Sequence, residues 1–167
     1  VENNYIPPYK FCTNLYATFI NRCYKFVLEN GFIGLVHPPT FMYLKTFEDV
    51  RKFMIEKTHI YLFVEWGYHG IFNPSVTVDS VFYVLEKTAV NKKDSVFVKL
   101  NHLTGKKRYL TYFETLQRFF DQKSHELLFS IQQSKLKIIK SWPFIYWISD
   151  DFREKFKLPA LSEIFDI

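Results

Sequence analysis

The chain has 167 residues, of which 48% are hydrophobic and 20% aromatic, so it is long and apolar enough to form a folded domain and disorder is excluded. Its apolar runs are far shorter than the roughly 18–20 residues that a membrane-spanning helix requires, so we expect no membrane. The net charge of +5 is modest and does not by itself indicate a nucleic-acid partner. The two cysteines, Cys12 and Cys23, suit reduced thiols better than a disulfide framework, which favours a cytoplasmic location.

The first element is predicted to be a helix from Thr13 to Glu29, because apolar residues recur there at spacings of three and four. The residues expected on its buried side are Leu15, Phe19, Ile20, Cys23, Phe26 and Val27. The continuous apolar run 32–36 follows and ends at Pro38-Pro39, which is typical of a strand buried on both faces.

A second helix and two more strands are predicted next. The helix runs from about Phe47 to Lys57, and Thr46 with Asp49 forms a candidate capping box at its start. Strands are expected at 59–66 and 76–85, separated only by a loop that begins at Gly67. The short loop makes these two strands antiparallel neighbours, whereas the first and second strands, joined through a helix, should be parallel.

The second half of the chain predicts an α+β segment without a clear linker. Strands are expected at 94–100 and 127–131, and helices at 112–120 and 145–156. The first of these helices should bury Phe113, Leu116, Phe119 and Phe120. The five histidines are scattered without metal-ligand spacing, so no metal site is expected.

Several short motifs, in this order and at this spacing, resemble the C-terminal half of the catalytic domain of N6-adenine DNA methyltransferases. That group includes type IIG restriction-modification enzymes and the methyltransferase of BREX phage defence. The resembling segments are 14–20 (NLYATFI), 36–38 (VHP), 41–44 (FMYL), 47–54 (FEDVRKFM), 67–72 (GYHGIF) and 142–149 (WPFIYWIS). The resemblance covers about residues 11–90 and 141–167.

The resemblance implies an α/β fold, namely the C-terminal half of a class I, Rossmann-like methyltransferase sheet with a reversed last strand. We expect residues 1–90 to form this half-domain and residues 91–167 to form an α+β connector leading to a target-recognition domain, with the two parts in one compact unit. Such a half-sheet leaves one strand edge unpaired, which predicts self-association.

The catalytic tetrapeptide of this family is Asn/Asp/Ser-Pro-Pro-Tyr/Phe, and its first residue accepts a hydrogen bond from the target amino group. The sequence Ile6-Pro7-Pro8-Tyr9 resembles it, but isoleucine offers no such acceptor, and no buried strand precedes the motif. The glycine-rich loop that binds S-adenosylmethionine is also missing, because the chain contains no Gly-x-Gly. Since the chain starts at Val1 rather than Met, we expect an excised piece whose catalytic and cofactor motifs lie upstream.

The resemblance assigns the remaining site residues. Phe72 matches the phenylalanine that stacks on the extruded adenine, although the alignment can slip to make Tyr68 the stacking ring; packing in the core is an equally good reading of Phe72. Phe41, Tyr68 and Pro38 are candidates for the pocket rim, and a place in the core is the alternative for Phe41 and Tyr68. Two lysine-rich segments, expected on solvated loops, are candidates for DNA phosphate contacts: Lys92 and Lys93, and Lys106, Lys107 and Arg108. Asp79 and Glu65 are lone carboxylates that we expect to have structural rather than catalytic roles.

The predicted function is therefore that of a fragment of a DNA adenine-N6 methyltransferase from a restriction-modification or phage-defence system. Its partners would be double-stranded DNA and the rest of the parent polypeptide, and the fragment alone would be inactive. The alternative is a non-catalytic α/β module that binds nucleic acid or protein. The length of the native reading frame upstream of Val1 distinguishes the two.

Overall fold

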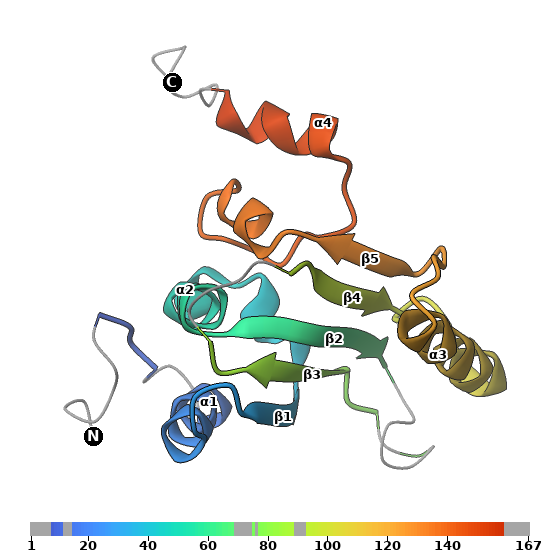
Figure 1. The fold of residues 1–167 in the computed structure, drawn as a ribbon, viewed down its shortest axis with the longest axis horizontal. Coiled ribbons are helices and arrows are strands. Elements are labelled where there is room, and N and C mark those ends of the chain that lie inside the picture. The colour runs from blue at the N-terminus through green and yellow to red at the C-terminus, as the bar shows by residue number, and fades with distance from the viewer. Residues whose placement is uncertain (1–7, 12–14, 69–74, 76, 89–92, 159–167) are drawn as a thin grey trace.

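A computed structural model describes residues 8–11, 15–68, 75, 77–88 and 93–158, which build a five-stranded sheet with helices on both faces (Figure 1). The strand order across the sheet is β1-β3-β2-β4-β5. The strands are β1 (Phe32–His37), β2 (His59–Gly67), β3 (Ser80–Glu86), β4 (Ser95–Lys99) and β5 (Leu128–Ile131).

The third strand lies between the first two. β3 pairs antiparallel with both β1 and β2, so β1 and β2 run parallel to each other on its two sides. On the other side of β2, β4 pairs with it in parallel, and β5 pairs antiparallel with β4. The predicted directions of the first three strands are therefore confirmed, although β3 begins at Ser80 rather than at Val76.

One face of the sheet is covered by α1 (Leu15–Phe26), α2 (Glu48–Lys57) and two 3₁₀ turns, Pro39–Met42 and Lys45–Phe47. The core on this face is rich in aromatic rings. Phe63 of β2 stacks on Tyr83 of β3 with 5.4 Å between ring centroids, and Phe41 and Phe144 pack against Phe63 edge-on. Phe41 thus belongs to the centre of the core.

The opposite face carries α3 (Gly105–Phe120), which covers only part of the sheet. A smaller core forms there from residues of β2, of β4 and of the turn after β4, namely Val64, Trp66, Val98, Leu100 and Leu103. β1 lies beyond this cover: Phe32 is 56% exposed and Val36 is 44% exposed. The prediction that this strand is buried on both faces is wrong, because only its alternate residues reach a core.

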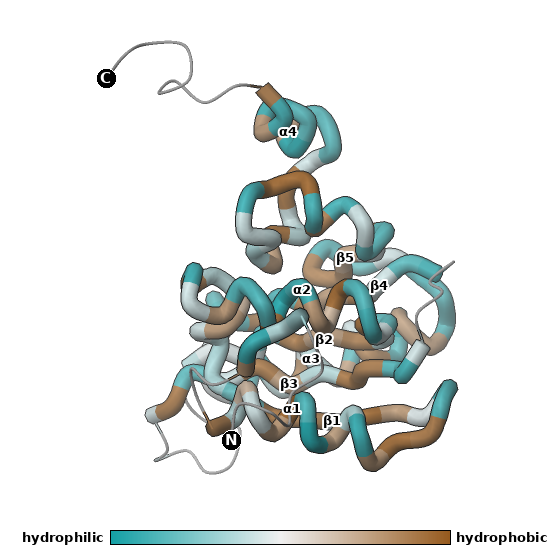
Figure 2. The backbone as a smooth tube through the Cα atoms, turned by 90° about the vertical axis from the view of Figure 1, so that its left-hand side faces the viewer, coloured by the Kyte–Doolittle hydropathy of each residue, from teal (hydrophilic) through white to brown (hydrophobic). Residues whose placement is uncertain are grey.

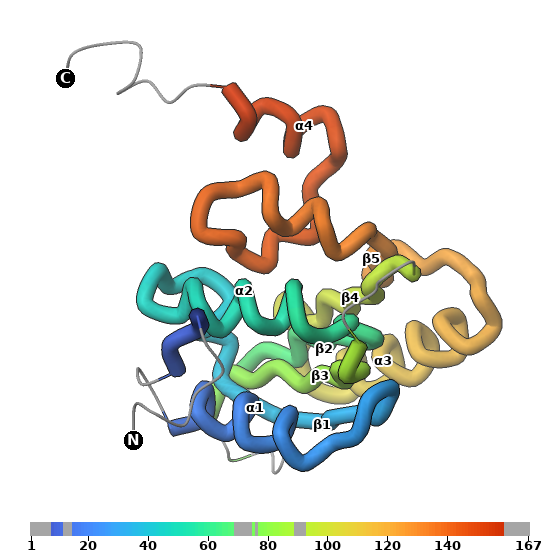
Figure 3. Tube along the Cα trace, turned by 60° about the vertical axis from the view of Figure 1, so that its left-hand side comes forward, coloured from blue at the N-terminus to red at the C-terminus, as the bar shows by residue number. Residues whose placement is uncertain are grey.

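The buried side of α1 also differs from the predicted one. Ala17, Ile20 and Asn21 face the sheet, whereas Leu15, Phe19 and Phe26 are 82%, 55% and 71% exposed. Apolar residues occur around much of this helix, so their spacing alone does not decide which side packs. In Figure 3, α1 and β1 form the lower rim of the molecule, on the side away from β5.

Two predicted helix starts are also wrong. Thr46 lies inside a 3₁₀ turn rather than at the N-cap of α2, and Asp49 instead accepts a hydrogen bond from the Lys10 backbone N–H at 3.1 Å. Helix α3 begins at Gly105 rather than at Tyr112. Lysine and arginine are good helix formers, so the basic residues after Gly105 extend the helix instead of forming a loop. Phe113 and Phe120, expected to be buried, are 64% and 69% exposed.

The segment after β5 packs against the sheet through Phe144 and Tyr146 and then continues into the last helix. After the 3₁₀ turn Gln133–Lys137, residues 142–148 contain no regular element, although their Phe144 and Tyr146 are core residues. The final elements are the short helix α4 (Asp150–Glu154), capped by the Ser149 hydroxyl, and the 3₁₀ turn Lys155–Lys157. The predicted helix over 145–156 is therefore wrong in its first part. In Figure 2, α4 lies at the opposite end of the molecule from β1 and is mostly hydrophilic.

Gln133 fastens this segment to the sheet. Its buried side chain accepts hydrogen bonds from the Ile60 backbone N–H and the Ser95 hydroxyl, both at 2.8 Å, and donates to the carbonyls of Ile55 and Thr58. The proposed boundary between residues 90 and 91 falls inside this arrangement, because β4 pairs directly with β2. Within the described residues, no helix is long and apolar enough to cross a membrane.

Candidate functional site

Three polar residues form one row at the carboxyl edge of the sheet. His37 of β1 is paired with Val81 of β3, Val81 with Glu65 of β2, and Glu65 with Lys99 of β4. Residues paired across strands project to the same face, and neighbouring strands lie about 4.8 Å apart. Ligands of open α/β sheets bind beside the carboxyl ends of the parallel strands, so this row marks the candidate site.

Glu65 is the buried centre of the row. It is 3% exposed, and its carboxylate accepts hydrogen bonds from the Tyr146 hydroxyl at 2.5 Å, from Asn101 Nδ2 at 2.9 Å and, at 3.5 Å, from the Tyr43 hydroxyl. Burial raises the pKa of Glu65, while the bond from Tyr146 and the nearby charge of Lys99 oppose that shift. The carboxylate thus joins three segments that are far apart in the sequence.

Four aromatic rings form a wall beside Glu65, namely those of Tyr43, Phe97, Tyr146 and Trp147. The Tyr146 ring stacks on Phe97 with 4.4 Å between centroids, and the Trp147 ring meets Tyr146 and Tyr43 edge-on at 5.1 and 6.4 Å. Lys99 Nζ lies 3.7 Å from the centroid of the Trp147 ring, which is a cation–π contact. Trp147 is 36% exposed and Tyr43 42%, so the outer part of the wall faces solvent.

Arg51 of α2 holds the two segments that carry this wall. Its guanidinium is fully buried and donates to the carbonyls of Phe41 (2.8 Å) and Leu44 (2.7 Å) and twice to that of Ser141 (3.0 and 2.8 Å). Burial lowers the pKa of Arg51, and the charge of Glu48 opposes that shift. The backbone on either side of Tyr43 and the backbone before Tyr146 are therefore fixed by a single side chain.

His37, at the other end of the row, is a structural group. It is 8% exposed, and its Nδ1 shares a hydrogen bond of 2.7 Å with the Tyr83 hydroxyl, beneath the ring of Tyr16. Burial lowers the pKa of His37 to about 4, so the imidazole is neutral at physiological pH. Among the described residues no three His, Cys, Asp or Glu side chains gather to hold a metal ion.

The end of β2, after which the chain continues towards Phe72, is fixed by contacts of Gly67 and Tyr68. Gly67 ends β2 with a φ of +88°, and a Cβ there would lie 2.6 Å from the Asn101 Cα, so no larger residue fits. The carbonyl of the next residue, Tyr68, accepts a hydrogen bond of 2.7 Å from Arg108 Nη1. Asn101, against which Gly67 packs, is the same residue that donates to Glu65.

The residues predicted for the base pocket differ in their surroundings. Phe72 lies outside the described residues, as does Lys92. Phe41 is fully buried in the aromatic core, so its assignment to a pocket rim is wrong. Tyr68 is 51% exposed at the end of β2, and Pro38 is half-buried directly after β1. Both lie at the carboxyl edge of the sheet.

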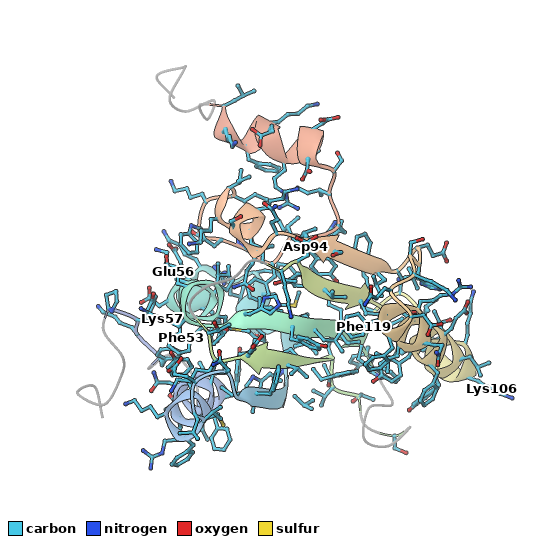
Figure 4. All side chains as sticks on the ribbon, viewed as in Figure 1. Phe53, Glu56, Lys57, Asp94, Lys106 and Phe119 are labelled. Carbon is cyan, nitrogen blue, oxygen red and sulfur yellow. The ribbon has the colours of Figure 1, made fainter. Side chains whose placement is uncertain are left out.

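The predicted phosphate-contact residues do not form one surface. Lys93 precedes β4, whereas Lys106 and Lys107 lie exposed in the first turn of α3, which follows the carboxyl end of β4. Figure 4 shows Lys106 at the outer end of α3. Arg108 is only 3% exposed and donates to the carbonyls of Leu103 and Tyr68, so its expected place on a solvated loop is wrong.

Of the two carboxylates expected to be structural, Asp79 is exposed immediately before β3. Its charge nevertheless contributes to raising the pKa of Glu65. The row of His37, Glu65 and Lys99 was not predicted as a unit, because it depends on the strand order and register. A signal for it exists in the sequence: each of the three parallel strands carries one ionisable residue close to its carboxyl end.

A second feature is an apolar cavity of about 520 Å³ between α3 and the uncovered face of β1 and β3. It is lined by Gly34, Val36, Phe82, Val84, Tyr112 and Phe113, among others. The cavity is open to solvent and offers almost no polar group, so it suits packing against apolar side chains rather than chemistry.

Comparison with known proteins gives two results. Residues 1–72 match the family described as Eco57I restriction-modification methylase. Among solved structures, the type I restriction-modification methyltransferase subunit from Streptococcus thermophilus superposes with a TM-score of 0.55 at 14% identity, over 72% of this chain and 27% of that one. This chain has the fold of a restriction-modification methyltransferase subunit.

A further structure supports the same fold. A chain from a study of complex assembly and conformational transition in the type I restriction-modification system has a TM-score of 0.52 at 13% identity, over 82% of this chain and 32% of that one. The chain therefore spans less than a third of each of these relatives. None of the curated protein sequences matches it.

S-adenosylmethionine is the cofactor that this methyltransferase fold implies. The five glycines of the chain stand at positions 31, 34, 67, 70 and 105, and no two of them are separated by a single residue. The backbone loop that would bind the cofactor is thus not supplied by these residues, and the carboxylate of Glu65 is already occupied by its three donors.

Proposed function

We propose that this chain is part of a DNA adenine-N6 methyltransferase of a restriction-modification or phage-defence system, of the type IIG or BREX kind. The match of residues 1–72 to the Eco57I restriction-modification methylase family carries this proposal. The reaction moves the methyl group of S-adenosylmethionine to the amino group of an adenine that has been rotated out of the duplex. The cofactor and the target amino group are held by residues upstream of this chain.

The contribution of this chain is one wall of the base pocket. Phe72 stacks on the extruded adenine, with Tyr68 and Pro38 at the rim. Stacking of an aromatic side chain on a base contributes on the order of 1–3 kcal/mol. The fixed end of β2 supports this role, because Gly67 packs on Asn101 and the Tyr68 carbonyl is held by Arg108. Lys106 and Lys107, which follow the carboxyl end of β4, contact phosphates of the same DNA, and Lys93 contacts a separate part of it.

The rest of the parent polypeptide is the second partner. Three features lie on neighbouring parts of the molecule: the exposed residues of α1, the outer edge of β1, which pairs with no described strand, and the apolar cavity of about 520 Å³. Contiguous exposed apolar surfaces mark contacts with other protein surfaces. The upstream half of the methyltransferase covers them, so the isolated chain is inactive and self-associates through β1. A cytoplasmic location follows from this function.

The direct test is a methyl-transfer assay on the protein that contains this chain. Incubation with duplex DNA and methyl-labelled S-adenosylmethionine should yield N6-methyladenine, measured by mass spectrometry of the nucleosides. Phe72→Ala should lower methyl transfer roughly tenfold or more while cofactor binding is unchanged. Absence of any methylated adenine, over a wide range of DNA sequences, would refute the proposal, and equal losses of transfer and cofactor binding would refute the role of Phe72.

The alternative function is a non-catalytic α/β module that binds nucleic acid or protein. The lack of a Gly-x-Gly and of an Asn-Pro-Pro-Tyr in the chain favours it. In that case the protein would bind DNA or another protein without transferring a methyl group. The same assay, accompanied by a DNA-binding measurement, therefore separates the two functions.

A further inference from the structure

We propose that Lys99 and Trp147 form a contact site for the sugar–phosphate backbone of DNA at the carboxyl edge of the sheet, the edge at which β2 ends. This inference rests on the proposed function and adds to it a site that the resemblance to methyltransferases does not assign. In this site the Lys99 ammonium pairs with a phosphate, and the exposed edge of Trp147 donates from its indole N–H and contacts the sugar.

Lys99 makes no ion pair with any residue that the structure describes. No carboxylate of a described residue lies within 4.0 Å of its ammonium, which instead contacts the rings of Trp147 at 3.7 Å and Tyr146 at 5.9 Å. Its neighbour in the sheet is Glu65, but both oxygens of that carboxylate already accept hydrogen bonds from Tyr146 and Asn101. The charges of Glu65 and Lys99 attract each other, but the Glu65 carboxylate is buried and hydrogen-bonded to other residues. A half-buried cation that is fixed on an aromatic face can therefore still bind an anion.

Trp147 packs against other side chains, but its indole N–H has no acceptor in the described part of the chain. Its ring meets Tyr146 and Tyr43 at its edges, and Lys99 lies over it. No described residue accepts a hydrogen bond from its indole N–H, and the side chain is 36% exposed. A rigid aromatic ring with an unused donor loses little conformational freedom on binding, so its contact with a ligand is favourable.

The position of the pair favours DNA over other anionic ligands. Lys99 ends β4 at the carboxyl edge of the sheet, in the same row as Glu65, from which the chain reaches Gly67 and the segment with Phe72. The exposed Lys106 and Lys107 lie in the first turn of α3, which follows the carboxyl end of β4, so they add positive charge near the same edge of the sheet. A series of cations beside an aromatic ring is complementary to a polyanion that also presents sugars and bases.

The matched control for Lys99 is Lys57. Both lysines are half-buried and neither has an ion pair among the described residues. Lys57 ends α2 just before the amino end of β2, so it lies at the opposite edge of the sheet from Lys99. Figure 4 shows Lys57 and Lys106 on opposite sides of the molecule. Loss of charge at Lys57 therefore tests for a general electrostatic effect.

The experiment measures binding of a fluorescent DNA duplex to the protein that contains this chain, by anisotropy, over a range of salt concentrations. Lys99→Gln should weaken binding at 0.1 M salt by roughly fivefold to tenfold. It should also make the negative slope of log K against log salt less steep by about 0.9, as expected for one lost phosphate contact. Trp147→Phe keeps a ring beneath Lys99 and loses the N–H, so it should weaken binding about threefold without changing the slope. Lys57→Gln should change neither quantity.

Equal binding and equal slopes for Lys99→Gln and Lys57→Gln would overturn the inference, provided that hydrogen exchange shows the Lys99→Gln variant to be folded. An acidic peptide, added as a competitor at the same concentration of negative charge as the DNA, should not displace the DNA. If it does, the site binds acidic ligands in general and the inference is wrong. The methyl-transfer assay separates the two proposals. A protein that methylates adenine but is insensitive to Lys99→Gln refutes only the contact site, whereas a protein that needs Lys99 for DNA binding but never methylates refutes only the proposed function.

Discussion

Replacement of Arg51 by methionine should loosen the aromatic wall beside Glu65. Arg51 is the only described side chain that donates to the carbonyls of both Phe41 and Ser141, and methionine fills a similar volume without a donor. The Leu44 carbonyl also accepts from the Phe47 backbone N–H, so it keeps one partner. Two buried carbonyls therefore lose their side-chain donor.

The magnitude follows from that count. An unsatisfied buried carbonyl costs about 1–3 kcal/mol, and the loss of the buried guanidinium offsets part of this because its desolvation is no longer required. We expect Arg51→Met to destabilise the protein by about 2–4 kcal/mol. Lys52→Met is the matched control, since Lys52 makes a surface ion pair with Glu48 at 2.7 Å, worth about 0–1 kcal/mol, and otherwise lies over the Trp142 ring with its Nζ 5.7 Å from the ring centroid.

Hydrogen exchange followed by mass spectrometry gives the local readout. In Arg51→Met, the backbone amides of segments 41–44 and 141–147 should exchange faster than those of β3, and Phe144 N–H is a suitable reporter because it donates to the Met42 carbonyl at 3.0 Å. The Lys52→Met protein should match the wild type in all three segments. Unchanged exchange of segment 141–147 in Arg51→Met would show that Arg51 does not hold the wall.

Three further predictions concern the same edge of the sheet. Glu65→Leu leaves the buried Tyr146 hydroxyl without its acceptor and should lower the free energy of unfolding by about 1–3 kcal/mol, whereas Glu65→Gln keeps an acceptor and should cost less than half as much; equal losses in thermal melts would contradict this. His37 is buried with a folded-state pKa of about 4 against 6.5 unfolded, so its contribution to stability is fully present above pH 6.5, falls as the pH drops towards 4 and changes no further below that. The loss due to His37 should be about 3 kcal/mol, and the pH dependence between 6.5 and 4 should be weaker by that amount in His37→Gln, because Tyr16 and Tyr83, the groups that face His37, do not titrate in this range. Burial also lowers the pKa of His59, which gives a slope that remains in both proteins, so equal slopes in the two proteins would refute the assignment. Gly67→Ala combines a positive φ with a Cβ 2.6 Å from the Asn101 Cα and should cost more than about 2 kcal/mol, while Gly105→Ala, with a φ of +53° and open space, should cost about 1 kcal/mol; similar losses would mean that the contact with Asn101 is unimportant.

The sequence predicts the existence of the strands well and their surroundings less well. The five strands were all expected, because short apolar runs bounded by Pro, Gly or Asn are recognisable without a fold. The buried side of α1 was not, because Leu15, Phe19 and Phe26 are as apolar as Ile20 and only the sheet decides between them. The start of α3 is also hard to predict, because its lysines and arginine are typical of solvated loops as well as of helices.

The candidate site was harder to predict than the fold. Glu65 and Lys99 are neighbours only because β4 joins β2 in parallel, and a sequence shows neither strand order nor register. The donors of Glu65 come from residues 43, 101 and 146, so no local pattern contains them. The motif around Tyr146 and Trp147 is part of the resemblance to methyltransferases, but its contact with the carboxyl edge of the sheet depends on the path of the chain from β5.

The insertion of β3 between β1 and β2 restricts the order in which the chain can fold during synthesis. β1 leaves the ribosome well before Ser80–Glu86 exists, and β3 is the strand with which both of its neighbours pair. The hairpin of β2 and β3 involves shorter sequence separations than the pairing of β1 with β3, so loop-closure entropy favours the hairpin as the nucleus onto which β1 then docks. Substitutions in β1 such as Ile33→Val would accordingly speed unfolding and leave the folding rate almost unchanged.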